Sequence, residues 1–211
     1  MRNIWTIANR EYKLYFASPA AYMIAFSILV VLGILFYLNI QVAALQQFAP
    51  SVQITLGPMA TLLMLATPPI TTRLLAEEMR SGTIELLLTA PVRDWDLVVG
   101  KWLGGFLLLL TIVAISFVYP VVLNQLVTPG IDQGPLMSGY LGMILLCAAL
   151  VAIGVAVSAF FSSQIAAFAA TLGILILMWW ILGPIAQTIG QVGLAGKVIG
   201  YLDLSAHYFD N

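Results

Sequence analysis

Five long apolar runs, nearly free of charged side chains, constrain this chain more than any other feature. A bilayer core about 30 Å thick is crossed by about 20 helical residues, and the runs are close to this length. They lack the two-residue alternation of membrane β-barrel strands. Only 8% of the residues are charged, far below the proportion in a soluble domain. The sequence therefore predicts an all-α integral membrane protein with spans at 20–39, 58–75, 97–122, 139–161 and 165–189.

The positive side chains predict the orientation of the spans. Lysine and arginine near span ends are retained on the cytoplasmic side. None lies in the connections 40–56 and 123–138, whereas seven flank the first span or the connection between the second and third. We expect a multi-pass protein of the cell (inner) membrane with a cytoplasmic N-terminus, and with 190–211 as an extracytoplasmic tail. The seven residues are Arg2, Arg10, Lys13, Arg73, Arg80, Arg93 and Lys101. Arg73 and Lys101 fall at span ends, where long side chains can reach the headgroups.

Residues 1–18 predict an amphipathic helix in the membrane surface. A helical wheel gathers most of the apolar and aromatic side chains on one face and the basic ones on the other. Glu11 is the exception, because it falls inside the apolar arc, where an unpaired carboxylate is costly. We expect a cytoplasmic arginine such as Arg73 or Arg80 to be its partner. The apolar face consists of Ile4, Trp5, Ile7, Ala8, Tyr12, Leu14, Tyr15 and Phe16.

The connection 76–96 concentrates charge on the predicted cytoplasmic side. Within it, 83–88 is long enough for about one and a half helical turns before Pro91 ends the helix. This short helix would present Leu87 and Leu88 beside Glu85, as a segment that docks into a groove of a soluble partner would need. A solvated turn with mixed charges is the alternative, although it does not require a run of leucines.

The same region resembles a known family. The stretch 77–105, EEMRSGTIELLLTAPVRDWDLVVGKWLGG, is similar to the signature of permease subunits of the type-2 ABC exporter family. The stretch 10–23, REYKLYFASPAAYM, is similar to the surface "elbow" of these permeases and to the entry of their first span. The resemblance covers essentially the whole chain, and is closest to the gliding-motility and copper-enzyme-maturation permeases.

The resemblance implies a single permease domain over 1–211, which pairs with a second permease in a homo- or heterodimer and binds cytoplasmic ABC ATPase subunits. Family members have six spans, so a sixth would follow Asn211. The coupling helix would be 83–88, and Arg10 and Glu11 would link the elbow to it. The ATPase-coupling surface would consist of Glu77, Glu78, Arg80, Gly82, Thr83, Glu85 and Leu87.

Other function classes find little support in the sequence. It contains no G-x-x-x-x-G-K-[ST] loop, so we expect no enzyme activity in this chain and ATP hydrolysis in a partner. One cysteine, Cys147 inside the fourth run, and one histidine, His207, predict no metal site or other cofactor. Charge-free spans argue against an ion channel or proton carrier. We expect membrane lipid and no nucleic acid as a partner. A structural or assembly subunit with a permease-like fold stays open as the alternative.

Overall fold

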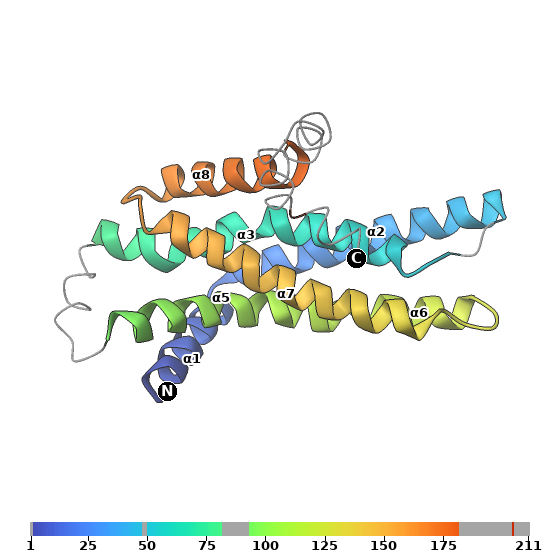
Figure 1. The fold of residues 1–211 in the computed structure, drawn as a ribbon, viewed down its shortest axis with the longest axis horizontal. Helices are drawn as coiled ribbons and strands as arrows, with labels where there is room; N and C mark the ends of the chain where they lie inside the picture. The colour runs from blue at the N-terminus through green and yellow to red at the C-terminus, as the bar shows by residue number, and fades with distance from the viewer. Residues whose placement is uncertain (1, 48–49, 82–92, 182–203, 205–211) are drawn as a thin grey trace, which may run out of the picture.

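The computed structural model describes residues 2–47, 50–81, 93–181 and 204. Its elongated helices lie side by side as a bundle (Figure 1), with α1 set obliquely at one end. The helices are α1 (Arg2–Ala17), α2 (Pro19–Gln46), α3 (Gln53–Ser81), α5 (Asp94–Ser116), α6 (Val118–Leu126), α7 (Gln133–Ser158), α8 (Gln164–Ile176) and the π-helical turn η1 (Leu177–Ile181).

Five helical segments of the described chain are long and apolar enough to cross a membrane, which confirms the predicted all-α membrane fold. They extend beyond the predicted spans at several ends, because helical hydrogen bonding continues into polar residues that hydropathy excludes. The last predicted span reaches residue 189, but its part after Ile181 lies outside the described residues. The five segments are Pro19–Gln46, Gln53–Leu74, Asp94–Leu126, Gln133–Ser158 and Gln164–Ile181.

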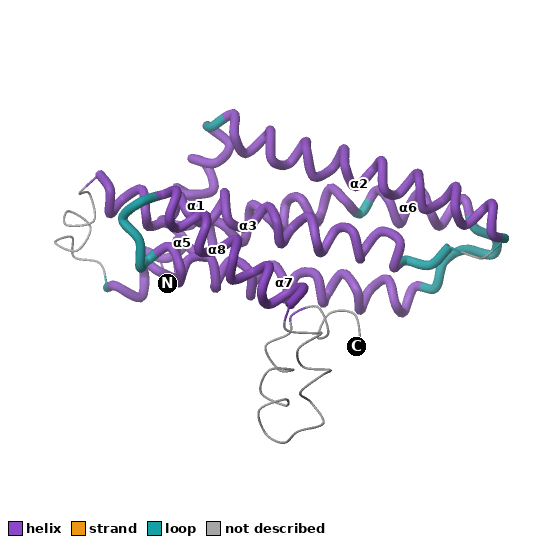
Figure 2. The backbone as a smooth tube through the Cα atoms, turned by 90° about the horizontal axis from the view of Figure 1, so that it is seen from above, coloured by secondary structure: helices purple, strands orange, loops and turns teal. Residues whose placement is uncertain are grey.

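The centre of the bundle is α3, which packs against α2, α7 and α8 (Figures 1 and 2). It is the least hydropathic of the five spans and also the most buried. Two of its buried hydroxyls are satisfied within the helix: Thr67 Oγ1 donates to the Leu63 carbonyl at 2.8 Å and Thr71 Oγ1 to the Thr67 carbonyl at 3.0 Å. Lipid tails solvate apolar side chains as well as leucine does, but they cannot solvate polar ones. The less hydropathic α3 is therefore the span that the neighbouring helices cover.

Small residues bring α7 close to α3. A Cβ atom on Gly154 would overlap the side chain of Thr71, and one on Gly139 would overlap that of Leu56. Without a hydrophobic force between helices in lipid, such close approach of the backbones is a main source of their association. Cys147 lies fully buried in the same core.

The third span, Asp94–Leu126, agrees with a predicted span but is not one continuous helix. It is interrupted at Phe117, between α5 and α6. Pro120 lies in the first turn of α6, where a missing backbone N–H leaves no hydrogen bond unmade. Helix α6 is held to α2 by Tyr119, whose hydroxyl donates to the Leu29 carbonyl at 2.6 Å.

Candidate functional site

Four charged residues from three separate parts of the sequence gather near the end of the α3 span and the starts of α5 and α8. We call this the charged end of the bundle, at the left of Figure 1. Arg10, Glu11, Arg73 and Lys101 line one cavity of about 280 Å³ there, and we call it the cationic cavity. Its remaining lining residues are Leu14, Tyr15 and Leu74.

The first wall of the site is α1, which lies directly against the start of α5. Two glycines of α5 permit the contact: a Cβ on Gly100 would lie 2.7 Å from the Cβ of Ile7, and one on Gly104 would lie 2.6 Å from the Cβ of Glu11. Ala8 of α1 is fully buried in the same contact face. The two glycines have the G-x-x-x-G spacing that brings membrane helices together.

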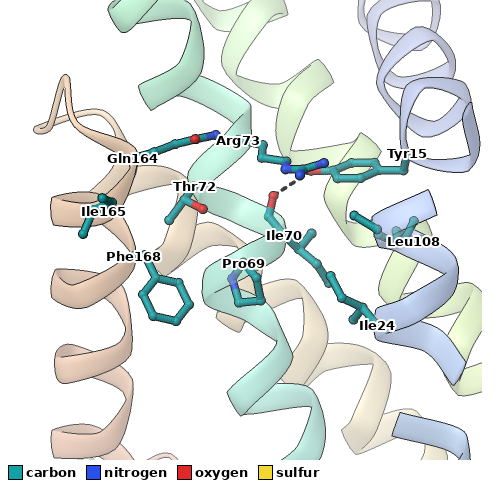
Figure 3. A pocket seen from close by; sticks show the side chains of 12 residues that line it. Tyr15, Ile24, Pro69, Ile70, Thr72, Arg73, Leu108, Gln164, Ile165 and Phe168 are labelled. Carbon is teal, nitrogen blue, oxygen red and sulfur yellow. Dashed lines mark hydrogen bonds between the residues drawn. The ribbon is translucent and has the colours of Figure 1, made fainter. Parts of the chain in front are cut away.

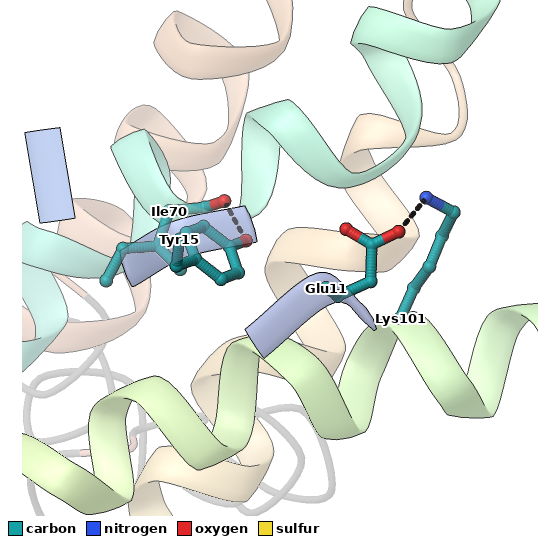
Figure 4. Close-up of polar contacts among 4 residues, drawn as sticks. All are labelled: Glu11, Tyr15, Ile70 and Lys101. Atoms are coloured by element: carbon teal, nitrogen blue, oxygen red, sulfur yellow. Dashed lines mark hydrogen bonds and ion pairs between the residues drawn. The ribbon is translucent and has the colours of Figure 1, made fainter. Parts of the chain in front are cut away.

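Two tyrosines of α1 add hydrogen bonds to this packing. The Tyr12 hydroxyl lies 3.0 Å from Thr111 Oγ1 of α5. The Tyr15 hydroxyl donates to the Ile70 carbonyl of α3 at 2.8 Å (Figure 4). The first helix is therefore held by both α3 and α5, at the height where α2 begins.

The amphipathic pattern predicted for α1 describes part of this arrangement. Ile7, Ala8 and Tyr15 belong to the predicted apolar face and do contact the bundle. Trp5 and Leu14, from the same face, keep 61% and 51% of their surface exposed. The apolar arc is wider than the protein contact, which leaves side chains that suit an interface with lipid.

Glu11 pairs with a different residue from the one predicted. Its Oε1 lies 3.2 Å from Nζ of Lys101 of α5, with side-chain exposures of 14% and 2% (Figure 4). The expectation of Arg73 or Arg80 was wrong for Arg73, and the side chain of Arg80 lies outside the described part of the chain. The expectation that Lys101 reaches out to the headgroups was also wrong. A buried charge needs a counter-charge, and the close α1–α5 contact supplies it.

Arg73 connects the end of the α3 span to the start of α2. Its Nη1 donates to Ser18 Oγ at 3.4 Å. Ser18 is the N-cap of α2, and the same oxygen accepts from the backbone N–H of Ala20 at 3.4 Å. The Arg73 side chain is exposed, and a guanidinium carries more N–H donors than the one that Ser18 accepts.

The structure describes the backbone of only some residues of the predicted coupling surface. Glu77, Glu78 and Arg80 belong to α3, whose helical backbone continues to Ser81, seven residues past the end of its candidate span at Leu74. Their side chains lie outside the described part. The other four predicted residues, Gly82, Thr83, Glu85 and Leu87, fall in 82–92, which is also outside it. The coupling surface therefore stays a prediction.

The prediction missed Lys101 as a site residue, together with the glycines on either side of it. The signal was present in the sequence as Gly100-Lys-Trp-Leu-Gly104. Read as a helix-packing motif, it would have indicated a helix pressed against this face of α5. It would also have placed a lysine beside that helix. Among the described residues, no group of three His, Cys, Asp or Glu side chains could hold a metal ion.

Comparison with known proteins adds one finding. A family model described as "ABC-2 family transporter protein" matches residues 5–203, and thus covers the described helices almost completely. No curated protein matches the chain.

Proposed function

The chain belongs to the ABC-2 family of transporter proteins and is a transmembrane subunit of an ABC transporter, and on this premise we propose that it moves a substrate with energy from ATP that a separate cytoplasmic subunit hydrolyses. The absence of a phosphate-binding loop in the sequence supports this division of labour. The proposal includes a second permease as partner and, by resemblance, a relation to the gliding-motility and copper-enzyme-maturation permeases.

The observation that carries the proposal is the attachment of α1 to α5. The segment 82–92 lies between α3 and α5 in the chain, so a partner that moves this segment acts on the ends of both helices. The close glycine contacts and the Glu11–Lys101 pair tie α5 to α1, and α1 leads through Ser18 into α2. A displacement at 82–92 would therefore reach three spans together, as energy coupling requires.

The charge distribution supports a cytoplasmic position of the charged end. Arg10, Arg73 and Lys101 line one cavity there, and Arg93 precedes the first turn of α5. Lysine and arginine near short connections favour the cytoplasmic side. We therefore propose an inner-membrane protein whose N-terminus and segment 82–92 face the ATPase. Glu77, Glu78, Arg80, Gly82, Thr83, Glu85 and Leu87 would form the contact surface.

The proposal is tested by purifying the protein in mild detergent and identifying the proteins that co-purify by mass spectrometry. We expect an ATPase subunit with the wild type and its loss with Glu85→Arg, because the substitution puts a cation into the proposed docking segment. Asp132→Arg is the matched control, since it reverses one charge at the opposite end of the bundle, before α7. It should retain the ATPase.

Recovery of membrane proteins without an ATPase, unaffected by Glu85→Arg, would contradict the proposal. It would support the alternative of a structural or assembly subunit.

A further inference from the structure

A second cavity adjoins the cationic cavity and differs from it in character. It has a volume of about 320 Å³ and lies between α2, α3 and α8. We call it the apolar groove. Tyr15 and Arg73 line both cavities. Figure 3 shows Arg73 at one end of the groove, with Ile24, Pro69 and Phe168 farther along it.

The depth of the groove follows from where the spans begin and end. Arg73 is the next-to-last residue of the candidate span Gln53–Leu74. The span of α2 begins at Pro19 and that of α8 at Gln164, so three neighbouring span ends meet at this level. The Arg73 end of the groove therefore lies at headgroup depth, and its apolar part lies beside the hydrocarbon core.

The charge of the cationic cavity favours an anion. Among the residues that the structure describes, its lining carries Arg10, Arg73 and Lys101 with Glu11, three positive charges and one negative, which gives these residues a net charge of +2. Lys101 is already engaged with Glu11, so the two arginines are the side chains suited to contact a ligand. Guanidinium groups match the planar, bidentate geometry of phosphate oxygens.

We propose that the two cavities together form a binding site for an anionic glycerophospholipid. Its phosphate lies against Arg73 and Arg10 in the cationic cavity. One acyl chain follows the apolar groove past Ile24 and Phe168. Because Arg73 faces both cavities, a single amphiphilic molecule fills the site better than a free anion or an uncharged chain. The bound lipid would join α1, α2, α3 and α8 at the charged end. This site requires only a membrane location, so it stands or falls independently of the ATPase partner.

Native mass spectrometry of the full chain in mild detergent tests the site. The protein is titrated with phosphatidylglycerol, with phosphatidylcholine of the same acyl chains, and with glycerophosphate as a headgroup without chains. We expect tightest binding of phosphatidylglycerol, weaker binding of phosphatidylcholine and none of glycerophosphate. Equal affinity for the two lipids would overturn the proposal, and so would binding of glycerophosphate as tight as that of phosphatidylglycerol.

Arg73→Gln tests the headgroup contact. A basic residue near an anionic headgroup contributes about 1 kcal/mol, so we expect about fivefold weaker binding of phosphatidylglycerol. Lys13→Gln is the matched control, because Lys13 is an exposed cation of α1 that lines neither cavity. Arg73→Lys keeps the charge but loses the bidentate geometry, so its affinity should lie between those of the wild type and Arg73→Gln, which separates headgroup binding from a folding defect. An equal loss in Arg73→Gln and Lys13→Gln would show diffuse attraction to the surface and overturn the site.

Phe168→Ala tests the acyl contact. It should weaken the binding of both lipids, whereas Ile174→Ala should not, although both side chains of α8 are 39% exposed and only Phe168 lines the groove. Equal effects of the two substitutions would contradict a chain in the groove. Association of two copies that displaces the lipid would assign the groove to a protein interface and would also overturn the proposal.

Discussion

Two helix–helix contacts, α3 with α7 and α1 with α5, both bring two backbones close together, but different side chains hold them. Both depend on glycines, Gly139 and Gly154 in α7, and Gly100 and Gly104 in α5. The described side chains buried between α3 and α7 are uncharged, and most are apolar or hydroxyl groups. The α1–α5 contact contains a buried ion pair and a tyrosine hydrogen bond.

The difference follows from where each contact lies. Shape complementarity alone holds two spans together, because lipid gives apolar surfaces no reason to associate beyond close packing. The first helix lies at the charged end, where headgroups and water can hydrate a charge before the helix docks. A charge pair there adds specificity for one register of α1 on α5. It also makes this contact more sensitive to the loss of a single group.

The largest expected effect comes from removing one charge of the pair. Glu11→Leu removes the carboxylate that pairs with the buried Lys101 ammonium, which destabilises the protein by about 3 kcal/mol. The double variant Glu11→Leu, Lys101→Met should recover most of this loss, because an apolar pair of similar volume avoids the buried charge. The free energy of unfolding, measured by denaturant titration in mixed micelles, checks both values. A double variant as unstable as Glu11→Leu would show that the buried charge of Lys101 is not the cause of the instability.

A smaller effect is expected at the centre of the bundle. Gly154→Ala adds a Cβ against Thr71 and forces the two helices apart, at a cost of about 2 kcal/mol. Gly173→Ala of α8 is the control, since a Cβ there meets nothing within 4 Å. The control should be neutral or slightly stabilising, because alanine favours a helix. The same unfolding measurement compares the two, and similar stabilities would refute glycine-mediated packing between α3 and α7.

The smallest expected effect separates the hydrogen bond of α1 to α3 from its contacts with α5. Tyr15→Phe removes the buried bond to the Ile70 carbonyl and should cost about 1 kcal/mol. Tyr22→Phe makes the same chemical change on a side chain that is 55% exposed, and should leave stability unchanged. Thermal unfolding in detergent compares the variants. If the two midpoints coincide, the anchoring of α1 rests on α5 alone.

Hydropathy and helical periodicity predicted the membrane spans and the amphipathic first helix. Apolar length located the five spans to within a few residues at most ends, and the helical wheel identified part of the contact face of α1. The interruption at Phe117 was not predicted, because an apolar run has the same hydropathy whether its helix is continuous or broken. The burial of α3 was not predicted either, since hydropathy does not say which spans touch one another.

The sequence by itself determined that the chain is a helical membrane protein, that its positive charge gathers around two segments, and that Glu11 needs a partner. These are properties of single segments, and they follow from the cost of placing polar groups in hydrocarbon. Only the tertiary structure decided that the partner is Lys101, and that Arg73 stands between a cationic cavity and an apolar groove. Pairings of this kind depend on which helix faces meet, and that is fixed by small residues whose role becomes visible only when two backbones lie side by side.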